Sequence, residues 1–300
     1  MKKLLVVGLA LVSAFSFGQF QDGLSVKKSP RKTETSTFGL GKVEIEYGSP
    51  KKNGRTLFGD LVPYGQVWRM GADGASTLEV STDFSMGKTK VAKGKYAMFL
   101  IPEEGSDWIF VLNKNADQWG AYQYDEKLNV AEIKVKASTT KESVECLTMV
   151  FNEKGGGEAA LTVSWGETSF DVPFFVEVLE QFNQSVDDII KNTPEKELWA
   201  ANGQAADFLL NNGVESAQAL EYSTIAVKEF NKLSADEKAK FKYYSGWIQW
   251  AHARALAANG KNKEALKVAK EIKADNAKGS FYAYERNQGD VDAALTSWAK

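Results

Sequence analysis

The hydrophobic periodicity of this chain changes near Phe175, and this change limits the folds that it can adopt. Before that point, apolar residues alternate with polar ones in short runs, as at 78–82 and 161–165. After it, the runs become longer and Ala, Lys and Glu dominate. A period of two is typical of half-buried strands, whereas the longer runs are typical of amphipathic helices. The sequence therefore predicts a β domain over residues 25–176 and an all-α domain over 184–300.

The β domain is expected to be an antiparallel β-sandwich. Its short apolar segments are separated by turn residues, and one of them, Tyr96–Ile101, ends at Pro102. Many short strands with turns between them favour a sandwich, and a jelly-roll-like strand order fits the same pattern. We expect Gly166 and Glu167 to turn the chain between two strands, and Gly155–Gly157 to form a hairpin loop.

The α domain contains two similar motifs. Ala206-x-x-Leu209-x-x-x-Gly213 recurs as Ala253-x-x-Leu256-x-x-x-Gly260, with a shorter echo at 289–295. Small residues let two helices pack closely, and glycine is a common helix terminator. The second helices would bury small and apolar residues, namely Ala219, Ser223 and Ala226 in the first pair and Ala265, Ala269 and Ile272 in the second.

Two helix starts are predicted in this domain. Thr193 precedes Pro194, which favours a helix with Thr193 as its N-cap. Ser234 stands three residues before Glu237, which is typical of a capping box. The segment 253–269 resembles a tetratricopeptide repeat, and the irregular spacing of the two motifs indicates a degenerate array of helix pairs. That resemblance implies a peptide or protein partner bound through the helical repeats.

The N-terminus has the pattern of an export signal. Lys2 and Lys3 precede an uncharged apolar run, and Ser16-Phe17-Gly18 places small residues before a cut at Gln19. The alternative is a membrane anchor, but the run falls short of the about 20 residues that a spanning helix needs. We expect a signal peptide over residues 1–18, cleavage near Gly18-Gln19, and a periplasmic or extracellular protein without a membrane span.

Charge and residue inventory exclude several classes of function. The net charge is −2, so no basic excess favours nucleic-acid binding. The only histidine, His252, lies in the α domain, which excludes histidine-dependent triads from the β domain. Cys146 is the only cysteine, so no intrachain disulfide forms, and we expect it to be a buried small hydrophobe, with a reactive thiol as the alternative. We predict no catalytic residue, no metal site and no cofactor.

A second resemblance covers residues 25–175. The segments 47–50, 54–59, 61–65 and 67–72, together with Ser29-Pro30, Gly94-Lys95-Tyr96, Ile101-Pro102, Trp108 and Trp119-Gly120, resemble a bacterial family of secreted proteins, domain of unknown function 2911. The family commonly reads Gly-Ala-Asn-Glu-Ala-Thr after its Trp-Arg pair, where this chain has Gly-Ala-Asp73-Gly74-Ala-Ser. This resemblance implies a domain and carries no activity with it.

Two arginines are candidate contacts to a ligand. Arg55 and Arg69 both lie among glycines and aromatic residues. A guanidinium presents a planar fork of donors that suits an anion or the hydroxyls of a sugar. The structural alternative is an arginine that ties loop carbonyls together, or that pairs with Asp60 or Asp73.

Aromatic residues suggest a carbohydrate platform. Trp119, Tyr122 and Tyr124 lie close in sequence, and the two tyrosines would share a face if the chain is extended there. Packing in the core or at its rim is the alternative for Trp119 and Tyr122, and it suits Trp108 and Trp165 better. The candidate binding residues are Arg55, Trp68, Arg69, Asp73, Trp119 and Tyr122.

Two hypotheses for function follow. The first is a non-catalytic binding or scaffold protein of the cell envelope, with a glycan or anion contact on the sandwich. The second is a hydrolase acting on glycans or the cell wall, with a carboxylate pair drawn from Asp60, Asp73, Glu79 and Asp83. A hydrolase needs two carboxylates that face each other across a cleft, whereas a binder needs only a patch lined by aromatic residues or arginine.

Overall fold

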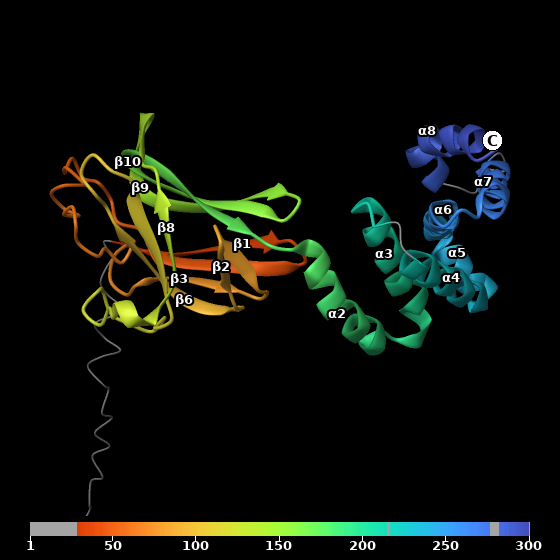
Figure 1. The fold of residues 1–300 in the computed structure, drawn as a ribbon, viewed down its shortest axis with the longest axis horizontal. Helices are drawn as coiled ribbons and strands as arrows, with labels where there is room; N and C mark the ends of the chain where they lie inside the picture. Colours follow the sequence, from red (N-terminus) through yellow and green to blue (C-terminus); the bar gives the residue numbers. More distant parts are fainter. Residues whose placement is uncertain (1–28, 215–216, 277–281, 300) are drawn as a thin grey trace, which may run out of the picture. The chain divides into compact units, whose positions relative to one another are not determined.

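A computed structural model describes residues 29–214, 217–276 and 282–299 of the chain (Figure 1). The chain divides into two compact units between Val176 and Glu177, called here the β-unit and the α-unit. The predicted leader and its cleavage site lie outside the described residues. None of the helices that the structure describes combines the length and the apolar character needed to cross a membrane.

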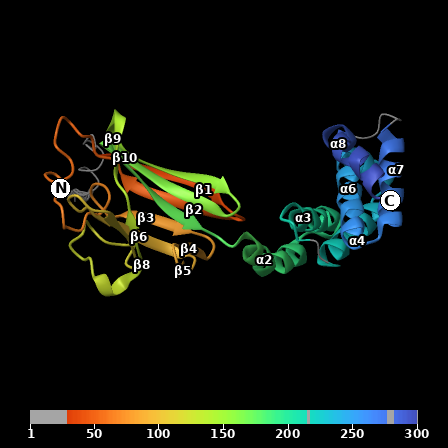
Figure 2. The same cartoon turned by 45° about the horizontal axis from the view of Figure 1, so that its top comes forward.

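The β-unit contains two antiparallel sheets (Figures 1 and 2). The larger sheet has the strand order β1 (Arg31–Phe38), β2 (Gly41–Gly48), β3 (Ser76–Val80), β6 (Gly94–Ile101), β7 (Trp108–Asn113) and β8 (Asn129–Val135). The smaller sheet has the order β5 (Thr89–Val91), β4 (Phe84–Met86), β10 (Glu158–Phe175) and β9 (Ser138–Gly155). A short 3-10 helix, η1 (Glu126–Leu128), precedes β8. The predicted β-sandwich is confirmed.

Aromatic rings fill the space between the two sheets. Phe38, at the end of β1, contacts Phe151 on β9 and Phe174 on β10, with ring centroids 5.3 and 6.3 Å apart. Trp108 and Trp165 are both buried, so the prediction that they belong to the core is confirmed. Large aromatic side chains bury much apolar area, which makes this interior the main source of stability of the β-unit.

Strand β10 runs through the point where a turn was expected. The apolar face of β10 is made by Leu161, Val163 and Trp165 in its first half and by even-numbered residues, Phe170 to Phe174, in its second. The buried face changes from odd-numbered to even-numbered residues, so one extra residue must be inserted in the strand. The register of β10 against β9 shifts on both sides of Gly166. The predicted turn at Gly166-Glu167 is therefore wrong. A β-bulge keeps one strand continuous and re-aims its side chains.

The end of β2 is tied to β9. Tyr47 accepts a hydrogen bond on its hydroxyl from the Met149 amide, at 3.1 Å. The buried Ser49 donates its hydroxyl to the Leu147 carbonyl, at 2.7 Å. These bonds join the two sheets. Cys146, next to this tie, is only half-buried, so its predicted burial is wrong: it lies on the face of β9 that is opposite to Leu147 and Met149.

The α-unit is built from antiparallel helix pairs. Its helices are α2 (Val178–Asn192), α3 (Leu198–Asn211), α4 (Ala217–Lys232), α5 (Ala235–Lys240), α6 (Lys242–Ala258), α7 (Asn262–Asn276) and α8 (Tyr282–Ser297), with the 3-10 turn η2 (Glu195–Glu197) before α3. Helices α3 and α4 pack together, as do α6 and α7, while α6 also contacts α3, α4 and α8. The predicted helical array is confirmed.

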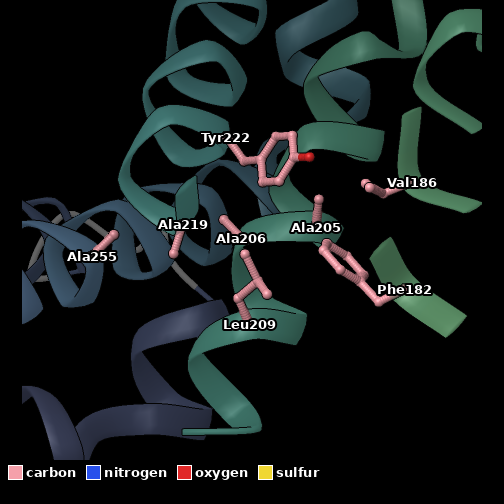
Figure 3. Close-up of a cluster of buried hydrophobic side chains, with 8 residues drawn as sticks. All are labelled: Phe182, Val186, Ala205, Ala206, Leu209, Ala219, Tyr222 and Ala255. Atoms are coloured by element: carbon pink, nitrogen blue, oxygen red, sulfur yellow. The ribbon is translucent and has the colours of Figure 1, made fainter. Parts of the chain in front are cut away.

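Small residues let these helices approach closely. Ala206 and Ala219 are fully buried where α3 meets α4, and Ala255 of α6 joins the same cluster with Leu209 and Tyr222 (Figure 3). All six residues predicted to be buried in α4 and α7 are buried: Ala219, Ser223, Ala226, Ala265, Ala269 and Ile272. Close backbone contact without large side chains explains why alanine recurs at these positions.

The two glycine motifs end their helices in the same way. Gly213 and Gly260 have φ values of 71° and 75°, in the left-handed region that glycine adopts without strain. The next amide donates to the carbonyl of the motif leucine, Leu209 or Leu256, at 2.9 Å in both cases. This is a Schellman-type end.

The two predicted helix starts have opposite outcomes. The capping box of Ser234 and Glu237 is present with both of its hydrogen bonds. The predicted N-cap at Thr193 is wrong. Thr193 ends α2, its hydroxyl donates to the Ile189 carbonyl at 2.7 Å, and η2 intervenes before α3.

Candidate functional site

The loop from Trp68 to Ser76 is held firmly against the larger sheet. Trp68 exchanges both backbone hydrogen bonds with Leu100 on β6, at 2.8 and 2.9 Å. Ser76 donates its amide to the Arg69 carbonyl and its hydroxyl to the Met70 carbonyl. Met70 and Asp73 have positive φ values of 54° and 64°. Such values are unfavourable for residues other than glycine, so the surrounding contacts impose the shape of this loop.

Two backbones meet directly beneath the loop. The Ala72 amide donates to the Gly48 carbonyl at 3.3 Å. A Cβ atom on Gly48 would lie 2.3 Å from the Ala72 carbonyl oxygen, and one on Gly71 would lie 2.8 Å from the Gly48 oxygen. Neither position has room for a side chain, so close packing of the two backbones explains why both residues are glycine.

A second loop, residues 115–124, is attached to the first. The Ala75 amide donates to the Gln118 carbonyl at 3.1 Å, and the Gly120 amide donates to the Asp73 carbonyl at 3.2 Å. Gly74 and Trp119 form an isolated antiparallel bridge between these two bonds. The two loops therefore behave as one backbone-bonded layer over the face of β6 and β7 that carries Phe99 and Val111.

Trp119 and Tyr122 project from this layer into solvent. Their exposed fractions are 65% and 89%. Gly120 turns the chain between them with a φ of 65°, and both the Tyr122 ring and the Arg69 Cδ atom approach the space beside its Cα. The structure thus brings together four of the candidate residues. We call this set the Trp119 surface: Arg69, Asp73, Trp119 and Tyr122.

Two expectations for this loop are wrong. Residues 120–123 form a turn, not an extended segment, so Tyr122 and Tyr124 do not share a face. Tyr124 packs on Phe99, with ring centroids 4.9 Å apart, and its hydroxyl accepts a hydrogen bond from Asn129. Burial raises the pKa of the Tyr124 hydroxyl. The alternative that places Trp119 and Tyr122 in the core or at its rim is contradicted by their exposure.

The guanidinium of Arg69 is not used to build the loop. Its Nε atom is buried and has no hydrogen-bond partner among the described residues, and none of their ion pairs includes it. The structural role expected for Arg69 belongs to Arg31, which donates to the Gly74 carbonyl at 3.1 Å and pairs with Glu46 at 3.2 Å. Arg69 therefore brings an unpaired positive charge to the Trp119 surface.

The remaining two candidates lie elsewhere. Trp68 is buried, with its ring against Trp165 and Phe58. Arg55 is exposed, and its Nε and Nη2 atoms donate to the Lys52 and Lys51 carbonyls.

Arg55 also lines a pocket of about 490 Å³ in the β-unit, called here the Phe58 pocket. Its walls come from the loop 52–58, from Ala137 and the first residues of β9, and from the bulged region of β10. The described residues around it are Lys52, Gly54, Arg55, Thr56, Leu57, Phe58, Tyr64, Trp108, Ala137, Ser138, Thr139, Glu167 and Thr168.

Carboxylates are sparse around this pocket. Glu167 is the one carboxylate among its described lining residues, and Lys52 donates to both of its oxygens at 2.7 Å. That hydrogen bond holds the pKa of Glu167 below its ordinary value. Of the acids proposed from the sequence, Asp83 accepts a hydrogen bond from the Lys93 amide at 2.8 Å, and Glu79 on β3 stands opposite Lys95 and Glu44.

Sequence reasoning missed most of the Phe58 pocket. Its walls combine segments that lie far apart in the sequence, and Glu167 was expected to lie in a turn. The one local signal was Arg55 beside Phe58. Among the residues that the structure describes, no group of three or more His, Cys, Asp or Glu side chains is placed to hold a metal ion.

The geometry defines a two-unit protein, with a two-sheet antiparallel β-unit that carries an exposed aromatic surface and a helical array that follows it. Residues 29–174 match the family described as "Protein of unknown function (DUF2911)", so the resemblance predicted from the sequence is confirmed for the β-unit. No curated protein and no solved structure matches the chain.

Proposed function

We propose that this protein is an exported, non-catalytic binding protein of the cell envelope whose β-unit binds glycan chains at the Trp119 surface. One observation carries the proposal. Trp119 and Tyr122 expose 65% and 89% of their surface from a turn that backbone hydrogen bonds fix to its neighbouring loop. Large apolar side chains held in solvent by an ordered backbone are typical of interaction sites.

The chemistry of the surface suits a sugar. An aromatic ring offers a flat apolar face to the C–H groups of a pyranose, and its exposed position leaves room for a long chain. Arg69 adds a positive charge for acidic groups of the ligand, and none of the ion pairs among the described residues includes it. Because the backbone of the loop is already fixed, little ordering entropy is lost when a ligand binds.

The arrangement of carboxylates favours binding over hydrolysis. The alternative function, a glycan or cell-wall hydrolase, needs an acid and a second carboxylate facing each other across a cleft. In the Phe58 pocket, the Glu167 carboxylate is neutralised by Lys52. Asp73 belongs to the Trp119 surface, where the other described members are an arginine and two aromatic residues.

Two further parts of the proposal rest on sequence pattern. Export follows from the Lys-Lys, apolar and small-residue order before Gln19. A peptide or protein partner for the α-unit follows from its stacked helices, because such arrays present extended surfaces. A photo-crosslinking residue at exposed Gln204 on α3 tests the partner, with the same residue at exposed Thr224 on α4 as its control. Equal crosslinking from both positions contradicts a dedicated surface.

The experiment that tests the glycan site compares three variants of the full chain on purified cell-wall polysaccharide and soluble oligosaccharides. Trp119→Ala and Tyr122→Ala are each expected to weaken binding at least tenfold, which corresponds to about 1.4 kcal/mol. Tyr244→Ala is the matched control, since Tyr244 is 52% exposed and lies on α6. Unchanged binding in both test variants, or release of reducing ends by the wild-type protein, contradicts the proposal.

A further inference from the structure

The Phe58 pocket is an open hollow in the β-unit whose chemistry differs from that of the Trp119 surface. Its volume of about 490 Å³ falls within the range of about 300–1,000 Å³ that is usual for small-molecule sites. The Phe58 ring is half-buried and lies 4.5 Å from the Trp108 ring and 5.9 Å from the Trp68 ring, measured between centroids. Phe58 therefore belongs to the core and also supplies a rigid aromatic wall.

Tyr64 supplies a second aromatic wall. Its ring is 38% exposed and lies against the backbone at Gly59, where a Cβ atom would be 2.8 Å from the nearest ring carbon. Gly59 has a φ of 92°, so this position needs a glycine both for its conformation and for the room that Tyr64 occupies. Two aromatic side chains thus line the same small volume.

The charges around the pocket leave one cation without a partner. Lys52 is paired with Glu167, so these two charges cancel. Arg55 uses its Nε and Nη2 atoms on two backbone carbonyls, and its Nη1 group donates to no described residue. No ion pair among the described residues includes Arg55. The pocket therefore has a net positive charge, which favours a ligand with one negative group.

Hydroxyl groups line the remaining wall. Thr56, Ser138, Thr139 and Thr168 all border the pocket, together with the Tyr64 phenol. Each hydroxyl can donate one hydrogen bond and accept others. Ser138 donates to the Ser169 carbonyl at 3.0 Å, which leaves its oxygen lone pairs available to a ligand. These side chains can form hydrogen bonds with a ligand that carries several hydroxyl groups.

The loop that carries Arg55 is fixed before any ligand arrives. Asn53 has a positive φ of 49°, and its amide donates to a Glu145 carboxylate oxygen at 3.0 Å. The Lys52 amide donates to the Glu145 carbonyl at 2.7 Å. An unfavourable backbone conformation held by outside contacts is typical of functional loops, and a fixed loop lowers the entropy lost on binding.

We propose that the Phe58 pocket binds an acidic sugar, with the sugar carboxylate against the Arg55 guanidinium and the sugar ring between Phe58 and Tyr64. The hydroxyl groups of the sugar face Thr139, Thr168 and the Lys52–Glu167 pair. This site is separate from the Trp119 surface, and it does not depend on the glycan proposal made for that surface.

The test is calorimetric titration of the full-length protein with D-glucuronate, D-glucose and acetate. Glucuronate is expected to bind saturably, while glucose lacks the carboxylate and acetate lacks the ring, so each should bind at least tenfold more weakly. Arg55→Gln is expected to weaken glucuronate binding at least tenfold. Lys51→Gln is the matched control, because it removes an exposed positive charge next to the pocket while the pocket lining is unchanged.

A second set of variants guards against a loss of folding in the Arg55 loop. Thr139→Val and Thr168→Val preserve side-chain shape and remove one hydroxyl each, and both should weaken glucuronate binding several-fold with unchanged melting temperature. Trp119→Ala should leave glucuronate binding unaltered, which separates this proposal from the glycan site. The proposal is overturned by absent saturation with glucuronate, by equal affinity for glucose or acetate, or by wild-type affinity in Arg55→Gln.

Discussion

The indole rings of Trp68 and Trp165 are stacked, with their centroids 5.7 Å apart and their planes 15° from parallel. Trp68 enters this contact from the loop above the larger sheet, and Trp165 comes from β10 of the smaller sheet. The Trp165 Nε1 atom is buried and has no hydrogen-bond partner among the described residues. Ring packing, not hydrogen bonding, therefore holds these two side chains in place.

Removal of the Trp68 ring should be severely destabilising. Trp68→Ala is expected to lower the free energy of unfolding by about 3–5 kcal/mol, because a buried aromatic residue leaves both lost contacts and a cavity. Trp68→Phe should lose less, since it retains a ring against Trp165. Urea denaturation followed by far-UV circular dichroism measures both. A loss below about 1 kcal/mol for the alanine variant contradicts a core role.

Arg69 should matter for binding and little for stability. Its Nε atom has no hydrogen-bond partner among the described residues and none of their ion pairs includes Arg69, so Arg69→Gln should change the free energy of unfolding by no more than about 0.5 kcal/mol. Oligosaccharide binding at the Trp119 surface should weaken. Arg31→Gln is the matched comparison, because it breaks the bonds to Gly74 and Glu46. We expect it to destabilise the protein by about 0.5–1.5 kcal/mol. The reverse order of the two stabilities would refute this assignment.

A methyl group at Gly48 should disrupt the contact under the loop from Trp68 to Ser76. The Cβ of Gly48→Ala would lie 2.3 Å from the Ala72 oxygen, so the two backbones must separate. Overpacking of this kind costs about 1–3 kcal/mol. Gly74→Ala, in the same loop, is the control, because its nearest atoms would be at ordinary contact distance, 3.7 Å and beyond. Thermal melts that coincide for the two variants would disprove the close approach.

His252 should stay neutral to a lower pH than an ordinary histidine. Its Nδ1 atom lies 3.0 Å from the Ser223 hydroxyl, and burial lowers its pKa, with a smaller opposing effect from Glu264 and a further lowering by Lys261. A lowered folded-state pKa means that the stability contribution is complete above the unfolded value of about 6.5. This contribution is lost as the pH falls from there through the folded-state pKa.

Because the chain has one histidine, proton NMR of its ring reports this pKa directly. We expect a midpoint below 6.5, and we expect His252→Gln to remove the matching fall in stability on acidification. A midpoint at or above the ordinary value would show that the ring is not desolvated.

The two units are expected to fold independently. The change of hydrophobic pattern near Phe175 motivates this prediction, and the boundary between the two compact units falls between Val176 and Glu177 in the sequence. Fragments 19–178 and 184–300 should each give a cooperative melt when expressed alone. Fragments that both lack a melting transition would show that neither unit is stable without the other.

Local patterns in the sequence were sufficient for most of the fold. Alternation predicted the strand segments that contain Leu78 and Leu161, and the Ser234–Glu237 spacing predicted a capping box that is present. These features depend on residues a few positions apart. The bulge in β10 was mistaken for a turn, because glycine followed by a polar residue is typical of both, and only the pairing with β9 distinguishes them.

The site was harder to predict, because exposure depends on contacts between distant segments. Arg55 and Arg69 have similar neighbours in sequence, yet only Arg55 donates to loop carbonyls. No local sequence pattern predicts that Trp119 is exposed either, because its position follows from the hydrogen bond between Gly120 and Asp73. The Phe58 pocket joins the loop 52–58 to residues of β7, β9 and β10, so no window of sequence contains its pattern.

The loop from Met70 to Ser76 contains residues that attach it to the sheet and residues that face away from the sheet. Gly71 and Ala72 lie against Gly48, and the Ser76 hydroxyl holds the Met70 carbonyl, a bond that the threonine common in the family could also make. Asp73 and Gly74, where this chain departs from the Asn-Glu pair common in the family, lie on the outer side beside Trp119. The bonds that attach this loop use the carbonyls of Asp73 and Gly74 and not their side chains, so substitution at these two positions should change the surface beside Trp119 while the sandwich beneath stays the same.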